Sequence, residues 1–434
     1  MRRISVVGLG YIGLPTAILA AQSGFEVFGF DIDLDRVKGI NSGNISIVEP
    51  GLSDRLLSVL SKGSFKAYKD LQYADCFIIA VPTPIKENKR ADLGYIFSAG
   101  EVVAKRLMPG NLIILESTVP VGATEALAAQ LEELSGMRVG IDFFVSHCPE
   151  RVLPGKILKE LTENDRVIGG MCHKASELSK HFYSKFVNGI LHVTDEKTAE
   201  MVKLIENSSR DVQIAFANQV AAMAEKAGID PFQVIELANK HPRVKILSPG
   251  TGVGGHCIAV DPCFLIESFP EETELLLAAR KVNNNKSLHV LDKILAKIDY
   301  LQDSGIERPK VFALGLTFKP NVDDIRESPA LKIAIELNRR KEIIDFYAFD
   351  PNLSNHTLQK LGLISKNMID GIKQADIVAI LVRHQQFESI PEELFENKVV
   401  IDPCGLIFYM HQAGSKNMLS ATSKFKYYFG AQSM

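Results

Sequence analysis

The strongest chemical signal in the sequence is a cysteine at the end of a glycine-rich segment. The segment runs from Ser248 to Pro262, and five of its first eight residues are glycine or proline. Such a backbone can adopt left-handed conformations and pass close to a ligand. Cys257 ends the glycine run and Asp261 lies four residues later, a pattern typical of a nucleophilic thiol with a carboxylate partner. Cys263 is a rival thiol, which we interpret as structural because it stands outside the glycine run.

A second signal lies near the amino terminus, where Gly8, Gly10 and Gly13 form a GxGxxG pattern. The pattern follows a strand-like run and opens a helix, and Asp31 ends the next strand-like run. In this context the glycines let the backbone approach a pyrophosphate, and the acid accepts hydrogen bonds from ribose hydroxyls. The motif predicts NAD rather than NADP, because an acid here repels a 2′-phosphate, although Arg36 offers that phosphate a positive partner. The alternative is a glycine-rich turn without a ligand.

Together the two signals indicate a particular kind of oxidation. Oxidising an alcohol to an aldehyde needs only a hydride acceptor and a base. Going on to the acid needs a tetrahedral adduct, which a thiolate supplies by forming a thiohemiacetal that is oxidised to a thioester and cleaved by water. We therefore predict a four-electron oxidation that consumes two NAD. Two alternatives stay open: a two-electron dehydrogenase in which Cys257 is only packed, and a sensor that binds nucleotides without turnover.

Three polar residues share one face of a long predicted helix. No glycine or proline interrupts the chain from Lys197 to Ala227, which predicts a helix of about 45 Å that joins two domains or two subunits. Lys203, Asn207 and Arg210 lie at i, i+4 and i+7, and therefore on the same face. The simplest interpretation is a solvated stripe. The alternative is a wall that positions an anionic or hydroxylated substrate, with Lys203 also favouring a nearby thiolate.

The elements that must position these residues alternate between strands and helices. Over residues 1–170 this alternation predicts a parallel sheet covered on both faces. The strand-like runs are Ile4–Val7, Glu26–Phe30, Cys76–Val81, Asn111–Glu116 and Phe143–His147. Thr83, Thr118 and Glu150 follow three of these runs, at the edge where open α/β sheets bind ligands. Each alone is better explained as a helix cap or turn residue, but their shared edge favours a site.

A second α/β region is predicted from about Glu307. Its strand-like runs are Lys310–Leu314, Ile344–Phe349, Ile377–Val382 and Lys398–Ile401. Between the two regions, Asp230-Pro231 is a helix start, as is Ser328-Pro329 later, and residues 240–262 are a loop. The fold class is therefore α/β.

Composition excludes several classes of protein. The 49 basic and 52 acidic residues leave a net charge of −3, which argues against a nucleic-acid partner held by general positive charge. No apolar run reaches about 18 residues, so we expect no membrane insertion. The six cysteines show neither a CxxC pair nor metal-ligand spacing, so we expect no metal and a reducing, cytoplasmic location.

Seven ordered motifs resemble the UDP-glucose/GDP-mannose dehydrogenase family across essentially the whole chain. They are GLGYIGLP (8–15), VPTP (81–84), ESTVPVG (116–122), PERVLPG (149–155), AEMVKLIENSSRD (199–211), GVGGHCIAVDP (252–262) and FKPNVDDIRESP (318–329). The resemblance implies two Rossmann-like doubly wound domains joined by a long central helix and a helical dimerisation domain. The implied domains are an NAD-binding domain over 1–195, a central domain with the cysteine loop over 196–300 and a UDP-sugar-binding domain over 301–434, in a homodimer.

The resemblance also implies a role for each matching residue. Cys257 is implied to be the nucleophile, with the other catalytic residues being Lys203 for the oxyanion, Asn207 and Asp261 for water, and Thr118 and Glu150 near the reacting carbon. The implied NAD contacts are Gly8, Gly10, Tyr11, Ile12, Gly13, Asp31, Arg36, Thr83, Thr118 and Arg326. The implied substrate contacts are Arg151, Val152, Lys203, Asn207, Arg210, His241, Arg243, Gly254, Phe318 and Lys319, with Arg243 a candidate to reach the partner subunit.

Two departures from the UDP-glucose pattern bear on the substrate. PERVLPG stands where those enzymes carry PEFLxEG, and Val260 stands where they carry a lysine. The segment HPRVKILSPGTGVGGHCIAVDP is instead similar to family members that act on UDP-N-acetyl-D-mannosamine. We therefore expect oxidation of C6 of that UDP-N-acetylhexosamine to its uronate. UDP-N-acetyl-D-glucosamine is the alternative substrate, and UDP-glucose a more distant one.

Overall fold

The computed structural model describes residues 1–47, 49–86, 88–153 and 155–414. The chain divides into two compact units. Unit 1 comprises Met1–Glu206 with Cys263–Pro270, and unit 2 comprises Asn207–Pro262 with the described residues from Glu271 onward. Each unit contains one β-sheet with helices on both faces, so the predicted α/β class with two Rossmann-like domains is confirmed.

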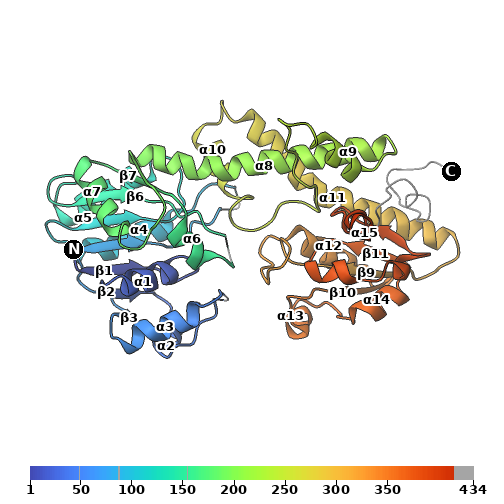
Figure 1. Cartoon of the computed structure of the whole chain (residues 1–434), viewed down its shortest axis with the longest axis horizontal. Coiled ribbons are helices and arrows are strands. Elements are labelled where there is room, and N and C mark those ends of the chain that lie inside the picture. Colours follow the sequence, from blue (N-terminus) through green and yellow to red (C-terminus); the bar gives the residue numbers. More distant parts are fainter. Residues whose placement is uncertain (48, 87, 154, 415–434) are drawn as a thin grey trace. The chain divides into compact units, whose positions relative to one another are not determined.

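Unit 1 contains an eight-stranded sheet in the order β3-β2-β1-β4-β5-β6-β7-β8 (Figure 1). Its strands are β1 (Arg3–Val7), β2 (Glu26–Phe30), β3 (Phe65–Tyr68), β4 (Cys76–Ile79), β5 (Leu112–Leu115), β6 (Phe144–His147), β7 (Arg166–Gly170) and β8 (Leu191–Thr194). The five predicted strands are present, with ends that differ by up to two residues. These five strands pair in parallel, as predicted, whereas β7, which was not predicted, pairs antiparallel with β6.

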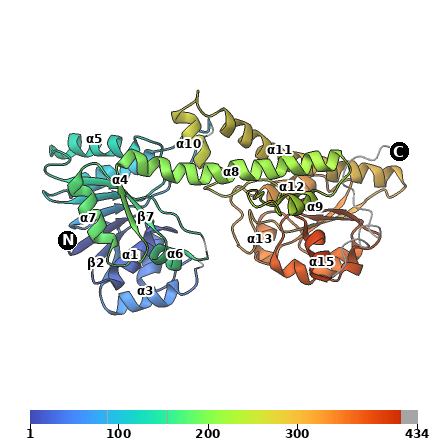
Figure 2. The same cartoon turned by 45° about the horizontal axis from the view of Figure 1, so that its top comes forward.

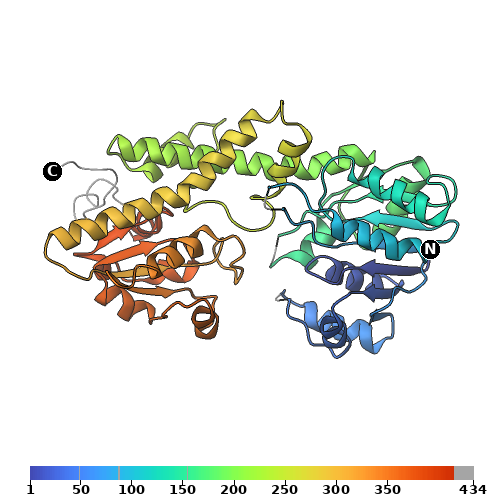
Figure 3. The same ribbon diagram turned by 180° about the vertical axis from the view of Figure 1, so that it is seen from behind.

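Alternating side chains along the central strands of unit 1 feed two separate hydrophobic cores. Ile4 and Val6 of β1 point to one core, and Val7 points to the other. Helices α1 (Gly13–Gln22), α3 (Leu52–Ser61), α6 (Ile157–Glu163) and α7 (His173–Tyr183) cover the first face. Helices α4 (Gly94–Ala104) and α5 (Ala123–Ser135) cover the second, which faces the viewer in Figure 3. Helix α2 (Leu34–Asn41) follows β2.

Two long helices dominate the middle of the sequence. Helix α8 (Glu196–Lys226) has 31 residues and agrees with the prediction to within one residue at each end. Gly228, with φ of +72°, follows it, and the next helix is α9 (Pro231–Ala238) (Figure 2). Helix α9 starts at the predicted cap, where Asp230 accepts hydrogen bonds from two backbone amides. Helices α10 (Asp261–Ser268) and α11 (Glu274–Asp303) were not predicted individually.

Unit 2 contains a four-stranded, fully parallel sheet in the order β10-β9-β11-β12. Its strands are β9 (Lys310–Leu314), β10 (Asp345–Phe349), β11 (Ile377–Ile380) and β12 (Val399–Ile401). Helices α11 and α12 (Pro329–Asn338) cover one face. Helices α14 (Met368–Gln374) and α15 (Leu406–Gly414), with the 3₁₀ turns η1 (Gln385–Ser389) and η2 (Glu392–Phe395), cover the other. Helix α13 (Asn355–Lys360) follows β10.

The four strands predicted for unit 2 are present, and Ser328 caps α12 by accepting a hydrogen bond from the amide of Leu331. Residues 415–434 of the predicted third domain lie outside the described residues. In the described part of the chain, none of the helices has the length and apolar character needed to cross a lipid bilayer.

Candidate active site

The Gly8–Gly13 turn joins β1 to α1 and has room for a ligand at only one of its glycines. Gly8 has φ of +92°, and a Cβ there would lie 2.7 Å from the carbonyl oxygen of Ala80. A Cβ on Gly13 would lie 1.8 Å from the oxygen of Gly8, whereas a Cβ on Gly10 would meet nothing within 4 Å. The protein's own packing therefore requires the outer two glycines. Gly10 borders open space, where a pyrophosphate can approach the backbone.

Asp31 follows β2 and is tied to the glycine turn. It is 4% exposed, and its Oδ2 accepts a hydrogen bond of 2.9 Å from the amide of Leu9. The same oxygen pairs with Nη1 of Arg36 at 2.9 Å, and Oδ1 accepts from the amide of Asp33 at 2.9 Å. The side chain of Arg36 is 45% exposed, so solvent or a ligand can replace it. Because a carboxylate oxygen can accept two hydrogen bonds, Asp31 retains capacity for a ribose hydroxyl.

The ends of β4 and β5 bring two predicted residues together. The hydroxyl of Thr83 donates to the carbonyl oxygen of Thr118 at 2.6 Å. The hydroxyl of Ser117 donates to the carbonyl oxygen of Val81 at 2.7 Å. These two bonds link the segments that leave neighbouring parallel strands, at the edge of the sheet where α/β proteins bind their ligands.

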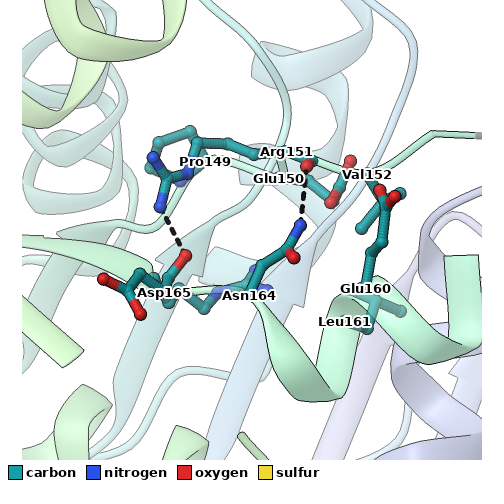
Figure 4. Close-up of a pocket in the computed structure, with 9 residues that line it drawn as sticks. Pro149, Glu150, Arg151, Val152, Glu160, Leu161, Asn164 and Asp165 are labelled. Carbon is teal, nitrogen blue, oxygen red and sulfur yellow. Dashed lines mark hydrogen bonds between the residues drawn. The ribbon is translucent and has the colours of Figure 1, made fainter. Parts of the chain in front are cut away.

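Glu150 follows β6 and lines a pocket with Pro149, Arg151, Val152 and residues of the 160–166 segment (Figure 4). It is 8% exposed, and its Oε1 has no hydrogen-bond partner among the residues that the structure describes. Burial raises the pKa of Glu150, while the positive charge of Lys203 opposes that rise. A buried carboxyl group with a raised pKa and an unpartnered oxygen is suited to holding a proton or a water molecule.

Arg151, a predicted substrate residue, is held by other groups of unit 1. Its Nη1 forms an ion pair of 2.6 Å with Glu206 of α8, and its Nη2 donates to the carbonyl oxygen of Asp165 (Figure 4). Asn164 donates to the carbonyl oxygen of Arg151 at 3.5 Å. Val152 is partly buried against the first core. An anionic ligand that binds Arg151 must therefore compete with Glu206 for the guanidinium group.

A buried ion pair that the sequence analysis missed lies behind this edge. Arg166 of β7 pairs with Glu116, and both side chains are less than a tenth exposed. Glu116 also accepts hydrogen bonds from Thr16 of α1 at 3.1 Å and from Tyr183 at 3.3 Å. Arg166 in turn donates to the carbonyl oxygen of Cys148 at 3.3 Å. The pair thus joins the nucleotide turn's helix to the segment that carries Glu150. A charged residue at the start of an apolar strand was its only signal in the sequence.

The three residues of the predicted stripe on α8 have different environments. Lys203 is 9% exposed, Asn207 is partly buried and Arg210 is exposed. The amide nitrogen of Asn207 donates to Oδ2 of Asp261 at 2.5 Å. Asp261 is 3% exposed, and its backbone amide donates to the carbonyl oxygen of Cys257 at 2.9 Å. The structure therefore links Asn207, Asp261 and the backbone of Cys257, and it rules out a uniformly solvated stripe.

The loop that carries Cys257 packs closely on a second loop of unit 2. A Cβ on Gly254 would lie 2.5 Å from the carbonyl oxygen of Glu327, and one on Gly255, whose φ is +79°, would lie 2.9 Å from the ring of Phe318. The amide of Gly255 also donates to the carbonyl oxygen of Arg326 at 3.1 Å. Glycine is required at both positions because the Phe318–Pro329 segment leaves no room for side chains. Cys257 itself is exposed and Cys263 is only partly so.

The remaining predicted residues of unit 2 lie at its surface. The ammonium group of Lys319 is 5.6 Å from the centre of the Phe318 ring. The guanidinium group of Arg326 pairs with Asp324 at 2.6 Å and is 53% exposed. His241 and Arg243 are both exposed in the loop after α9. Across the described ranges, no three His, Cys, Asp or Glu side chains gather in a way that could hold a metal ion.

Comparison with known proteins assigns the chain to a family. Three family models match in order: the NAD binding domain over residues 2–187, the central domain over 197–285 and the UDP binding domain over 312–408 of UDP-glucose/GDP-mannose dehydrogenases. The chain belongs to the UDP-glucose/GDP-mannose dehydrogenase family. It is therefore an NAD-dependent nucleotide-sugar 6-dehydrogenase.

Individual relatives of this dehydrogenase cover nearly its whole length. It is 45% identical over 412 residues to an NDP-N-acetyl-D-galactosaminuronic acid dehydrogenase of Ralstonia nicotianae, an alignment that covers 93% of this chain and 96% of the relative. It is 46% identical over 402 residues to a UDP-N-acetyl-D-mannosamine dehydrogenase of Campylobacter jejuni, covering 90% and 97%. The solved UDP-D-ManNAc dehydrogenase from Pyrococcus horikoshii is 39% identical, with a TM-score of 0.85 and coverage of 96% and 97%.

The residues of the dehydrogenase that would hold NAD fit this cofactor. The open space beside Gly10 admits a pyrophosphate, and Asp31 is an acceptor for ribose hydroxyls. Tyr11 and Ile12 lie in the same turn, directly before α1. Unit 1 carries these residues with Thr83, Thr118, Glu150 and Lys203, whereas unit 2 carries Cys257, Asn207 and Asp261.

Proposed function

We propose that this dehydrogenase oxidises C6 of UDP-N-acetyl-D-mannosamine to the uronate through a thioester on Cys257, using two NAD per sugar. The observation that carries the proposal is the cysteine loop. Cys257 is exposed at the end of a glycine run, and its carbonyl oxygen accepts a hydrogen bond from Asp261, which is itself bonded to Asn207. An exposed thiol on a loop whose backbone is tied to a carboxylate–amide pair supports acyl transfer to water.

The proposed four-electron reaction consists of two oxidations followed by hydrolysis, and its atoms and electrons balance when the steps occur in the following order. Bound NAD supplies a hydride acceptor, once for each of the two oxidations. The alcohol at C6 loses a proton and a hydride to become an aldehyde. Sγ of Cys257 then bonds to C6 while the aldehyde oxygen gains the thiol's proton, and loss of a second hydride and that proton leaves a thioester. Water adds to the thioester, the Sγ–C6 bond breaks, and the carboxylic acid leaves with the thiol restored.

Other residues are proposed to assist individual steps of this reaction. The ammonium group of Lys203 stabilises the oxyanion that develops at the C6 oxygen. Asp261, oriented by Asn207, accepts a proton from the attacking water. Glu150, whose pKa is raised by burial, holds a proton or a water near the reacting carbon with Thr118. The remaining proposed contacts of NAD and of the UDP-sugar are those implied by the family motifs.

The identity of the sugar rests on similarity. Relatives named UDP-N-acetyl-D-mannosamine dehydrogenase are 40–46% identical, and the chain lacks both the second glutamate of PEFLxEG and the lysine that Val260 replaces. A relative at 45% identity is named for N-acetyl-D-galactosaminuronic acid, which makes an NDP-N-acetyl-D-galactosamine a second candidate. UDP-N-acetyl-D-glucosamine and UDP-glucose remain alternatives, since epimers differ by only one or two hydrogen bonds in a pocket.

The organisation of the protein is part of the same proposal. We propose an NAD-binding domain over 1–195, a central domain over 196–300 through which two copies dimerise, and a UDP-sugar domain over 301–434. The family models over 2–187, 197–285 and 312–408 support these limits. A cytoplasmic location is proposed because NAD and UDP-sugars are cytoplasmic metabolites.

The test measures NADH formed per sugar consumed for four substrates: UDP-N-acetyl-D-mannosamine, UDP-N-acetyl-D-galactosamine, UDP-N-acetyl-D-glucosamine and UDP-glucose. We expect two NADH per UDP-N-acetyl-D-mannosamine and a covalent acyl adduct on Cys257 in rapidly quenched mixtures. Cys257→Ala is expected to abolish acid formation, whereas the matched control Cys263→Ala retains it. One NADH per sugar with accumulating aldehyde, or acid formation by Cys257→Ala, contradicts the mechanism.

A further inference from the structure

One buried histidine of unit 2 has no role in the proposed reaction. His384 follows β11, is 0% exposed and lies at the carboxyl edge of the four-stranded sheet. Its Nε2 is 3.1 Å from Oδ2 of Asp350, which follows β10, the strand on the far side of β9 from β11. Its Nδ1 is 3.0 Å from the backbone nitrogen of Asn321 and 2.9 Å from the amide nitrogen of Asn352. Buried polar groups as fully bonded as these fix the geometry of what they touch.

The partners of His384 define which nitrogen carries the proton. A backbone N–H can only donate, so Nδ1 must accept the hydrogen bond from Asn321 and cannot carry a proton. Nε2 therefore carries the hydrogen and donates it to Asp350. The histidine acts as a neutral connector with an acceptor on one side and a donor on the other.

This connector holds both ends of one turn, residues 317–321. At the start of the turn, Oδ2 of Asp350 accepts hydrogen bonds from the amides of Leu316 at 2.6 Å and Thr317 at 3.2 Å. At its end, Asn321 has φ of +60°, a left-handed conformation that costs free energy for a residue other than glycine. Asn321 is kept there by its bond to His384 and by the amide of Gln385, which donates to its side-chain oxygen at 2.9 Å.

The turn carries Phe318 and Lys319. The Phe318 ring lies against Gly255, two residues before Cys257, closely enough that a Cβ there would be 2.9 Å from the ring. The position of the turn therefore determines both where Lys319 stands and what supports the backbone of the cysteine loop.

We propose that His384 is a positioning residue for the sugar nucleotide: through Nδ1 it fixes the 317–321 turn, and thereby Phe318 and Lys319. The inference rests on the proposed function, in which these two residues bind the sugar nucleotide. His384 acts at a distance from the substrate, through Asn321. Its loss therefore weakens sugar-nucleotide binding more than it slows hydride transfer, and leaves the NAD turn in unit 1 unchanged.

Two substitutions by residues of similar shape test whether His384 positions the 317–321 turn or only fills space in the core. His384→Asn places an amide oxygen close to the position of Nδ1 and keeps an acceptor for Asn321. His384→Gln places an amide nitrogen close to the position of Nε2 and keeps only the donor to Asp350. We expect KM for the UDP-sugar to rise about tenfold in His384→Gln and about twofold in His384→Asn, with KM for NAD unchanged in both. Equal KM values for the two variants, or a change in Tm alone, would overturn the proposal.

Two further variants keep the test decisive if both histidine substitutions fold poorly. Asn321→Ala changes an exposed turn residue, removes the bond from Gln385 and disfavours the left-handed conformation, so we expect a similar rise in KM for the UDP-sugar. The matched control is Phe395→Leu in the core on the same side of the sheet, which should lower Tm without changing KM. An unchanged KM in Asn321→Ala contradicts the proposal.

The measurement uses whichever sugar nucleotide the wild-type enzyme turns over. The two proposals can therefore fail separately. The number of NADH formed per sugar tests the thioester mechanism, and the difference in KM between His384→Asn and His384→Gln tests the role of His384.

Discussion

The turn that follows the first strand has the same hydrogen bonds in both units, but its surroundings differ. In unit 1 the amide of Gly8 donates to the carbonyl oxygen of Phe30 at 2.8 Å, and Leu9 donates to Oδ2 of Asp31 at 2.9 Å. In unit 2 the amide of Gly315 donates to the carbonyl oxygen of Phe349 at 2.9 Å, and Leu316 donates to Oδ2 of Asp350 at 2.6 Å. Both glycines have positive φ, +92° and +85°. Each unit thus ties its first strand to an acid at the end of its second.

The difference lies in what else the acid binds and how soon the helix begins. The side-chain partner of Asp31 is Arg36, which is 45% exposed, whereas that of Asp350 is His384, which is 0% exposed. Helix α1 begins directly at Gly13, so its amino terminus and the acid both lie at the turn where we propose that NAD binds. In unit 2 a longer segment, which includes Phe318 and Arg326, separates the turn from the start of α12 at Pro329. Both acids are buried, so the difference lies in the partner: we propose that the turn binds a dinucleotide where the partner is exposed and can be displaced, and that it holds a loop where the partner is buried.

The largest expected effect comes from adding a methyl group to one tightly packed glycine in each unit. Gly13→Ala places Cβ 1.8 Å from a backbone oxygen, and Gly315→Ala places it 2.6 Å from Val382. We expect each to lower stability by about 1–3 kcal/mol or more, measured by thermal unfolding without ligand. Gly10→Ala is the matched control, because its Cβ meets only open space. It should leave Tm unchanged without NAD but raise KM for NAD, and a loss of Tm in this variant would contradict the assignment of the space to a ligand.

The second effect separates the two acids by ligand. Asp31→Asn removes a charged acceptor for the ribose, so KM for NAD should rise about tenfold to a hundredfold while KM for the UDP-sugar stays constant. Asp350→Asn should do the reverse, because the acid holds the 317–321 turn. Steady-state kinetics with each substrate varied in turn measures both. An increase in KM for NAD in Asp350→Asn would contradict the hypothesis that Asp31 serves NAD binding and Asp350 serves UDP-sugar binding.

The smallest effect is the acid dependence of stability in unit 2. Burial raises the pKa of Asp350, but the bonds from His384 and the backbone outweigh it, so the pKa lies below the ordinary 3.8. A carboxylate with a lowered folded pKa stabilises the protein above about pH 4, and this contribution is lost as pH falls through the folded value. The difference in Tm between wild type and Asp350→Asn should therefore shrink as pH falls below 4. A difference that stays constant with pH contradicts the ionised state of Asp350.

The sequence predicted those parts of the fold that have a local, periodic signal. The NAD turn, helix α8 and most strands of both sheets follow from apolar periodicity and from glycine spacing. Helix α11 was missed because polar residues point inward from it: Arg280 pairs with Asp211 at 2.7 Å, and Asn283 bonds to Asn218 at 3.0 Å. Inward-facing polar side chains interrupt the apolar pattern on which a helix prediction depends.

The site was predictable where one motif holds the interacting residues and less so where distant segments meet. The ion pair of Glu116 with Arg166 and the connection of His384 to Asn321 both join segments at least fifty residues apart. A single polar residue after or within an apolar strand gives no indication of its partner. The recurrence of an acid directly after the second strand of each unit, Asp31 and Asp350, was a signal that could have exposed the second turn.

The exposure of Cys257 has a practical consequence for anyone who handles the enzyme. Burial raises the pKa of Cys148 and of Cys404 to about 12, and raises that of Cys76 as well, so these sulfurs are poor targets for alkylating reagents and peroxide. Cys257 stands in solvent instead. If Cys257 is the nucleophile, as we propose, an electrophile added in modest excess should count the active molecules in a preparation. Storage without a reductant should then lower activity before it lowers the amount of folded protein.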